Sequence, residues 1–250
     1  MSRMVYEACC ASAEDVLLAE RAGADRVELN SCLLLGGLTP SLGMMEAARR
    51  AKIPIIAMVR PREGGFCYTE TEFGAMCRDA EALLGAGADG IAFGCLLPDG
   101  RVNERRCREL MGMIGNKQSV FHRAFDITPD WRQALACLMG LGVTRVLTSG
   151  QAPSAPEGAE TLKEMMEYAG GRIEILPGGG IRPENAAELA KKTGCRQFHA
   201  TAHGYSADAG FSPQPRVCFS GGEIPQEGCY RALEEAKARA MANTLHSLGE

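Results

Sequence analysis

The chain has 250 residues, of which 46% are hydrophobic, with a formal net charge of -4 and a pI of about 5.7. The acidic balance argues against nucleic acid or an anionic membrane as a partner, and no apolar run reaches the roughly 18 residues that span a bilayer. The first residues lack the apolar core of a signal peptide. We therefore expect a cytoplasmic protein in which residues 1–250 form a single domain around one large core.

Short apolar runs rich in β-branched residues recur along the chain, and segments of helical period separate them. The predicted strands lie near residues 5–9, 26–30, 54–60, 90–94, 119–124, 144–149, 172–176 and 196–201. Eight strands alternating with helices in a chain of this length predict an α/β fold, a closed (β/α)8 barrel of the TIM type. An open doubly wound sheet is the alternative, but Ala-Ser-Ala at residues 11–13 replaces its glycine-rich fingerprint.

The ends of the predicted helices carry their own signals. Ser12 and Ser41 precede helical segments and are expected to cap them. Pro183 fits the first position of another helix, where the N–H that proline lacks would have no partner. Gly23 and Gly87 each stand just before a predicted strand, as a glycine that ends a helix does. These signals support the alternation of helices and strands.

Residues 205–228 interrupt the alternation, because they contain three prolines and several glycines and serines. We expect a long irregular loop after the eighth strand, which would serve as a lid or as an interface element. A last helix is expected from about residue 229 to about residue 245.

Polar side chains gather at the C-terminal ends of the predicted strands. Because side chains alternate along a strand, residues two apart share a face. One face carries the polar residues Glu7, Cys9, Glu28, Asn30, Arg60, His122, Thr148 and His199. The other face, which includes Val59 and Leu147, is mostly apolar and suits packing against helices. We expect the polar set to point into the barrel, at the rim where barrel enzymes have their sites.

A buried strand ends in three chargeable side chains, His122, Arg123 and Asp126. Burying them without partners would cost several kcal/mol, so they are expected at the mouth of a site. His122 is a candidate general base, and Arg123 is a candidate for holding an anion. Asp126 would orient either His122 or Arg123.

Other strand ends complete the candidate catalytic set. Glu28 would share the acid and base roles with His122, and Arg60 would hold an anion. The catalytic candidates are Glu7, Glu28, Arg60, His122, Arg123, Asp126 and His199. A buried structural network is the alternative, in which Glu7 and Glu28 pair with arginines such as Arg26. Buried ion pairs often stabilise less than apolar packing does. The large number of polar groups on one face therefore favours a ligand site.

A glycine-rich turn follows the seventh strand, at Gly178, Gly179 and Gly180. In barrels, the loops after the seventh and eighth strands often bind phosphate through backbone N–H groups. Thr148 and Ser149, after the sixth strand, would add hydroxyl donors. The sequence therefore predicts an anion site at these five residues, and a tight turn that merely needs glycine is the alternative.

Taken together, these motifs resemble the CutC copper homeostasis family. The matching pieces run in order along the chain: Glu7-x-Cys9, Gly23–Leu29, Gly36–Ser41, Met58–Arg62, Phe66-x-Tyr68, Phe93-Gly94, Asp99-Gly100, Phe121–Asp126, Arg145–Gly150, Pro177–Gly180 and Phe198-His199. The resemblance implies a cytoplasmic barrel, commonly a homo-oligomer, that is linked to copper handling and copper binding.

The cysteines bear on copper, because Cu(I) prefers soft sulfur ligands. The eleven cysteines include no C-x-x-C pair and no zinc-type spacing. Many members of the family have cysteine where this chain has Asn30, and here the next cysteine is Cys32. Cys9 and Cys32 are therefore the candidate metal ligands, with His199 nearby. A divalent metal held by the two inward glutamates is the other ion that the residues allow.

Two functions follow from different features of the sequence. The resemblance implies a copper-binding protein of copper homeostasis, whose partner is the copper ion. The inward Glu, Arg and His residues favour an enzyme that acts on a small anionic metabolite, phosphorylated or carboxylated, and hydrolase, isomerase and lyase chemistry all stay open. A barrel that has lost its site and serves as an interaction scaffold is the third reading, and it predicts no ligand.

Overall fold

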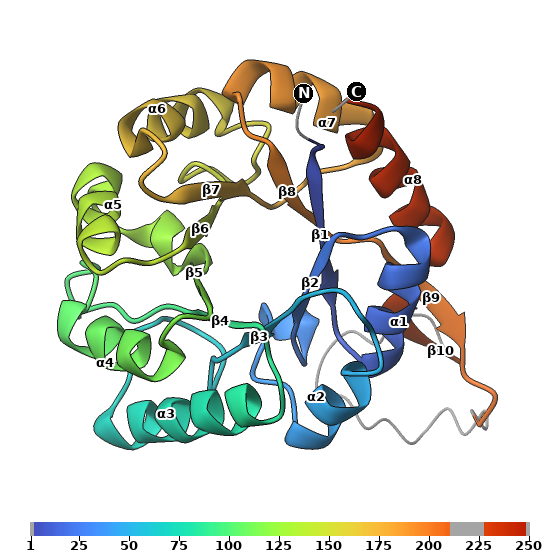
Figure 1. Ribbon diagram of the computed structural model, residues 1–250, viewed down its shortest axis with the longest axis horizontal. Coiled ribbons are helices and arrows are strands. Elements are labelled where there is room, and N and C mark those ends of the chain that lie inside the picture. Colours follow the sequence, from blue (N-terminus) through green and yellow to red (C-terminus); the bar gives the residue numbers. More distant parts are fainter. Residues whose placement is uncertain (1–2, 211–227, 249–250) are drawn as a thin grey trace.

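The structure is a computed structural model that describes residues 3–210 and 228–248. Eight parallel strands curl into a barrel (Figure 1). They are β1 (Val5–Cys10), β2 (Arg26–Leu29), β3 (Ile55–Met58), β4 (Gly90–Phe93), β5 (Gln118–Phe121), β6 (Arg145–Thr148), β7 (Glu174–Pro177) and β8 (Gln197–Ala200). The order in the sheet is β7-β6-β5-β4-β3-β2-β1-β8, and a parallel bridge between Gly178 and His199 joins its edges. The (β/α)8 barrel is confirmed, and the open doubly wound sheet is excluded.

Helices surround the barrel on the outside (Figure 1). They are α1 (Ala13–Ala22), α2 (Leu42–Ala48), α3 (Glu70–Gly85), α4 (Glu104–Ile114), α5 (Trp131–Gly140), α6 (Ala159–Ala169), α7 (Pro183–Thr193) and α8 (Glu235–Ser247), with short 3-10 helices η1 (Leu33–Leu35) and η2 (Arg123–Ile127). The predicted caps are confirmed, because the hydroxyls of Ser12 and Ser41 accept hydrogen bonds from backbone N–H groups of α1 and α2. No helix of the described residues is long and apolar enough to cross a bilayer.

The apolar residues form two layers, one on each side of the strands. The outer layer lies between strands and helices and contains fully buried aromatic rings such as Phe93, Phe121 and Phe198. Each such ring contributes about 1.5–3 kcal/mol by leaving water. The inner layer fills the barrel and consists of Ile56, Met58, Ala92, Val120, Leu147 and Leu176. Most of these residues stand in the second half of their strands, so the inner layer lies directly below the strands' C-terminal ends.

An antiparallel hairpin follows the barrel, formed by β9 (His203–Ala207) and β10 (Cys229–Leu233). The prediction of an irregular loop over residues 205–228 is therefore wrong at its first residues, and the last helix begins at Glu235 rather than near residue 229. The side chain of Asp15 on α1 holds both strands of the hairpin against the barrel. It accepts a 2.8 Å hydrogen bond from the Leu233 N–H and contacts His203. Residues 211–227, on which the rest of the predicted lid falls, lie outside the described residues.

Candidate functional site

A cavity of about 260 Å³ lies at the C-terminal ends of the strands. Its lining includes the predicted site residues Cys9, Glu28, Arg60, His122, Arg123, Gly179 and His199. Its volume is near the small end of the range of about 300–1,000 Å³ that is typical of ligand pockets. The structure thus brings six of the residues predicted for catalysis or metal binding to one place.

The predicted alternation of side chains holds for most strands, and β6 is the exception. Arg145 begins β6 and points into the barrel, where it bonds to side chains of β7 and β8. Leu147, two residues later, therefore belongs to the inner layer and lines the cavity. Thr148 lies on the opposite face, and its hydroxyl donates to Asp126. The prediction that Thr148 points inward and Leu147 outward is wrong. The strand begins with an inward-facing arginine, Arg145, and the alternation then turns Leu147 inward and Thr148 outward.

Three potential metal ligands meet in the cavity: Cys9 from β1, Glu28 from β2 and His199 from β8. Their ligand atoms lie within 4.8 Å of one another, and all three residues are buried. No other group of three or more His, Cys, Asp or Glu residues in the described ranges has this spacing. We call these three residues the ligand triad.

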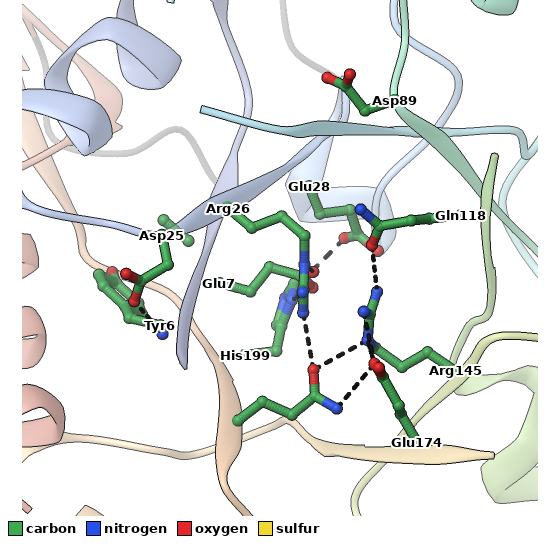
Figure 2. A network of polar contacts seen from close by, with 12 residues as sticks. Tyr6, Glu7, Asp25, Arg26, Glu28, Asp89, Gln118, Arg145, Glu174 and His199 are labelled. Carbon is green, nitrogen blue, oxygen red and sulfur yellow. Dashed lines mark hydrogen bonds and ion pairs between the residues drawn. The ribbon is translucent and has the colours of Figure 1, made fainter. Parts of the chain in front are cut away.

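Glu7 lies behind His199 and fixes its imidazole ring. The Nδ1 atom of His199 is 2.8 Å from a Glu7 carboxylate oxygen, while its Nε2 atom is 4.0 Å from Glu28 (Figure 2). A carboxylate on one ring nitrogen orients the other nitrogen, as carboxylates behind metal-binding histidines do. Arg26 in turn donates to the other Glu7 oxygen. The predicted structural network therefore exists for Glu7, and it supports the triad.

The buried charges shift the pKa values of these groups in different directions. Burial alone would raise the pKa of Glu7, but Arg26 and His199 lower it well below its usual range. Burial raises the pKa of Glu28, and the Glu7 charge adds to the rise. Burial would lower the pKa of His199, but the hydrogen bonds of Cys9 and Glu7 raise it well above its usual value. Burial also raises the pKa of the Cys9 thiol.

Asn30 stands beside the triad, at the position where the sequence differs from many members of the resembled family. Its Nδ2 group donates to a Glu28 oxygen at 2.9 Å and lies 3.7 Å from the Cys9 sulfur. Gly37 covers Asn30, since a Cβ atom at Gly37 would lie 2.5 Å from the Asn30 Oδ1 atom. The φ of Gly37 is also +84°, a conformation that favours glycine. Asn30 therefore holds Glu28 in place.

Cys32 does not join the triad. It is exposed and directly precedes η1 with a φ of +48°, and it does not belong to the group formed by Cys9, Glu28 and His199. The structure therefore brings one of the two predicted cysteine ligands, Cys9, into the cavity. The predicted pair of inward glutamates is also divided, because Glu7 is turned to Arg26 and His199 while Glu28 lines the cavity.

His122 lines the opposite side of the cavity in a fixed neutral form. Its Nδ1 atom accepts a hydrogen bond from the Ala124 N–H at 3.1 Å and so caps η2, which leaves the proton on Nε2. The Nε2 atom is buried and has no hydrogen-bond partner in the part of the chain that the structure describes. Burial, with the nearby Arg60 charge, lowers the pKa of His122 to about 3. Gly94 makes room for the ring, since a Cβ atom there would lie 2.4 Å from it.

We expect His122 to make the protein less stable in acid. The unfolded chain binds a proton at this side chain below about pH 6.5, whereas the folded protein does so only near its pKa of about 3. As the pH decreases through this window, the free energy of unfolding should therefore decrease, by up to about 1.4 kcal/mol per pH unit from this group. Above the window the group has no effect.

The variant His122→Asn tests this expectation, because asparagine keeps an acceptor for the Ala124 N–H and removes the titrating ring. Urea unfolding across the acidic window should show a shallower decline for the variant than for the wild type. Parallel curves for the two proteins would show that His122 does not stay neutral in the folded state.

Arg60 connects the cavity to the loops around it. Its Nη1 atom donates to the carbonyl oxygens of Leu35 and Gly37, and its Nη2 atom donates to that of Gly64. Its Nε atom is buried and has no hydrogen-bond partner within residues 3–210 and 228–248. Gly36 lies against the guanidinium, since a Cβ atom there would be 2.9 Å from Nη1. Arg60 thus holds the loops after β2 and β3 together and keeps unused donors.

Arg123 and Asp126 form a pair at the rim. Arg123 donates to Asp126 at 2.7 Å and to the Ser149 hydroxyl at 2.7 Å, which matches the predicted orienting role of Asp126 toward Arg123. Asp126 also accepts from the hydroxyls of Thr148 and Ser149. The two hydroxyls predicted to bind an anion therefore already donate hydrogen bonds to Asp126.

The glycine turn after β7 is packed closely against its neighbours. Gly178 lies against Leu147 and His199, and a Cβ atom at Gly178 would be 2.5 Å from Leu147. Gly179 lines the cavity near Arg123, and Gly180 has a φ of +73°. The turn needs glycine for these contacts, and anion binding by the turn stays a prediction.

Comparisons with known proteins agree on one family. The model of the CutC family matches residues 4–204. A CutC family protein of Treponema denticola is 43% identical over 249 residues, which cover 99% of this chain and 100% of that protein. A CutC family protein of Chromobacterium violaceum is 45% identical over 206 residues, or 82% and 83% of the two chains.

One solved structure supports the same family, and a second shows only the fold. The crystal structure of the CutC protein of Streptococcus agalactiae, a proposed copper homeostasis protein, has a TM-score of 0.75 and 31% identity, and covers 78% of this chain and 97% of that one. A structure described as native KDPGal has a TM-score of 0.59 and 15% identity, over 99% and 97% of the chains, and shows the fold alone.

Proposed function

This chain belongs to the CutC family, and from that premise we propose that it takes part in copper homeostasis by binding Cu(I) at the ligand triad. The observation that carries the proposal is the meeting of three buried ligand atoms within 4.8 Å. The relative from Streptococcus agalactiae, whose description names copper homeostasis, adds support.

The chemistry of the triad suits a soft ion. The Cys9 sulfur and the His199 imidazole are ligands that Cu(I) accepts readily, while the Glu28 carboxylate is a harder ligand that would complete the site or balance its charge. Glu7 would fix the His199 ring from behind. Both Cys9 and His199 must lose a proton to bind, so copper binding would release protons.

A reducing compartment would keep such a site functional. The cysteines of the described residues are all free. We therefore infer a cytoplasmic location, because disulfides are rare there. The homo-oligomer implied by the family is part of the same proposal, and size-exclusion chromatography with light scattering measures it directly.

A titration with Cu(I) tests the proposal. Under reducing conditions and in competition with a coloured Cu(I) chelator, the wild-type protein should bind one copper ion per chain. X-ray absorption of the complex should show sulfur and nitrogen neighbours, as expected for Cys9 and His199. Copper bound only through several sulfur atoms would place the ion elsewhere, and so would a complex without sulfur.

An enzyme acting on a small anionic metabolite is the second candidate function. The arrangement that favours it is a carboxyl group on each side of His199, with Glu7 2.8 Å from Nδ1 and Glu28 4.0 Å from Nε2. The pKa of Glu7 is lowered and that of Glu28 is raised. Such pairs divide acid and base roles in many active sites. Glu28 would be the proton donor in this case. Turnover of a small anionic metabolite by the wild type that Glu28→Gln abolishes would support this candidate.

A further inference from the structure

Two hydrogen-bond donors in the cavity have no partner among the described residues. They are the Nε atom of Arg60 and the Nε2 atom of His122, and both atoms are buried. Arg60 is 6% exposed and His122 is 3% exposed, and both residues line the cavity. Buried donors are satisfied in nearly all folded proteins, so these two indicate a missing acceptor.

The residues that carry the two donors share one aromatic neighbour, Phe66. The guanidinium carbon of Arg60 is 5.0 Å from the centre of the Phe66 ring, and the His122 ring centre is 5.0 Å from the same point. Phe66 also lines the cavity. Arg60 and His122 therefore both pack beside Phe66, and the Arg60 charge is near enough to lower the pKa of His122.

The charge of Arg60 is not balanced by a carboxylate of the described residues. Its bonds go to three backbone carbonyl oxygens. The phenol of Tyr68, beside it, supplies no counter-charge, because burial raises its pKa and keeps it protonated. The neighbouring Arg123 is already paired with Asp126. A buried cation without a counter-ion favours an anion in the cavity.

The donor pattern selects the class of anion. A guanidinium has five N–H groups, of which three are used here, so two remain. A planar fork of N–H groups matches a carboxylate, and one negative charge balances one guanidinium. A phosphate dianion would exceed that balance. His122 adds a neutral N–H donor, because its Nδ1 atom accepts from the Ala124 N–H and leaves the proton on Nε2.

We propose that the cavity binds a small monocarboxylate, whose oxygens accept hydrogen bonds from the free N–H groups of Arg60 and His122. The volume of about 260 Å³ fits a small metabolite. This inference goes beyond copper binding, because it requires no metal. It deepens the second candidate function by naming the ligand class, and carboxylate binding without turnover would support the inference while counting against the enzyme.

Calorimetric titrations of the metal-free, full-length protein with acetate and pyruvate test the proposal, with acetamide as the uncharged analogue and inorganic phosphate as the other anion. His122→Asn keeps the cap of η2 and should weaken carboxylate binding by about 10-fold. Arg60→Lys keeps the charge but loses the fork, and should weaken binding by about 10-fold or more.

Arg62→Lys is the matched control, because Arg62 lies two residues from Arg60 but pairs with Glu72 instead of lining the cavity. Weakening in both cavity variants and none in the control supports the proposal. Equal affinities in all four proteins overturn it, as does the absence of carboxylate binding to the wild type. The proposal is also overturned if acetamide binds as tightly as acetate does, or if phosphate binds more tightly than both carboxylates.

Discussion

Replacing Cys9 with serine should weaken Cu(I) binding by more than about 100-fold, because loss of an outer-shell partner alone costs about 10–100-fold and Cys9 would be a direct ligand. Cys9 supplies the thiol of the triad, and a hydroxyl is a poor substitute for the sulfur that Cu(I) prefers. Competition with a Cu(I) chelator under reducing conditions measures the change.

Cys32→Ser is the matched control for this experiment. Cys32 is exposed and lies outside the triad, so its loss should leave the copper affinity unchanged. Circular dichroism of both variants shows whether the fold is retained. Copper affinity that depends on Cys32 and not on Cys9 would contradict the assignment of the triad.

Replacing Arg26 with methionine should destabilise the protein by about 3–5 kcal/mol, because the buried Glu7 carboxylate loses its arginine partner. Arg26 and Glu7 are 7% and 1% exposed, and Arg26 also donates to Gln197 at 3.0 Å. Figure 2 shows Arg26 and Glu7 in the barrel interior, with His199 beside them. Chemical denaturation at neutral pH measures the free energy of unfolding.

A second pair of variants makes this prediction sharper. Arg108→Met removes a pair with Glu104 whose side chains are 64% and 60% exposed, and it should cost only about 0.3–0.5 kcal/mol. The double variant Arg26→Met/Glu7→Gln should recover part of the lost stability, because the glutamine carries no buried charge that needs Arg26. A cost for Arg26→Met as small as that for Arg108→Met would show that the buried pair contributes little.

The barrel could be predicted from sequence because its signals are local. Each strand is a short apolar run, and glycines such as Gly23 end the helices that precede strands. The hairpin of β9 and β10 gave no such signal. Its last residue, Leu233, is held by Asp15 on α1, and a contact between residues 218 positions apart leaves no periodic trace in the sequence.

The site was predictable as a set of residues and less so as contacts. Side-chain alternation correctly indicated that Glu28, His122 and His199 would converge. It failed for β6, where Arg145 takes an inward position that an apolar residue usually has. The pairing of Glu7 with His199 also required the register between β1 and β8, which only the closed barrel supplies.

The register of β1 and β8 has a consequence for synthesis of the protein. Glu7 is directly opposite His199, although 192 positions separate them in the chain. A ribosome must therefore deliver nearly the whole polypeptide before the two halves of the proposed copper site can meet. Nascent chains and fragments that stop before β8 would carry Cys9 without its imidazole partner. Only a chain whose ends have come together would be able to capture the ion in this way.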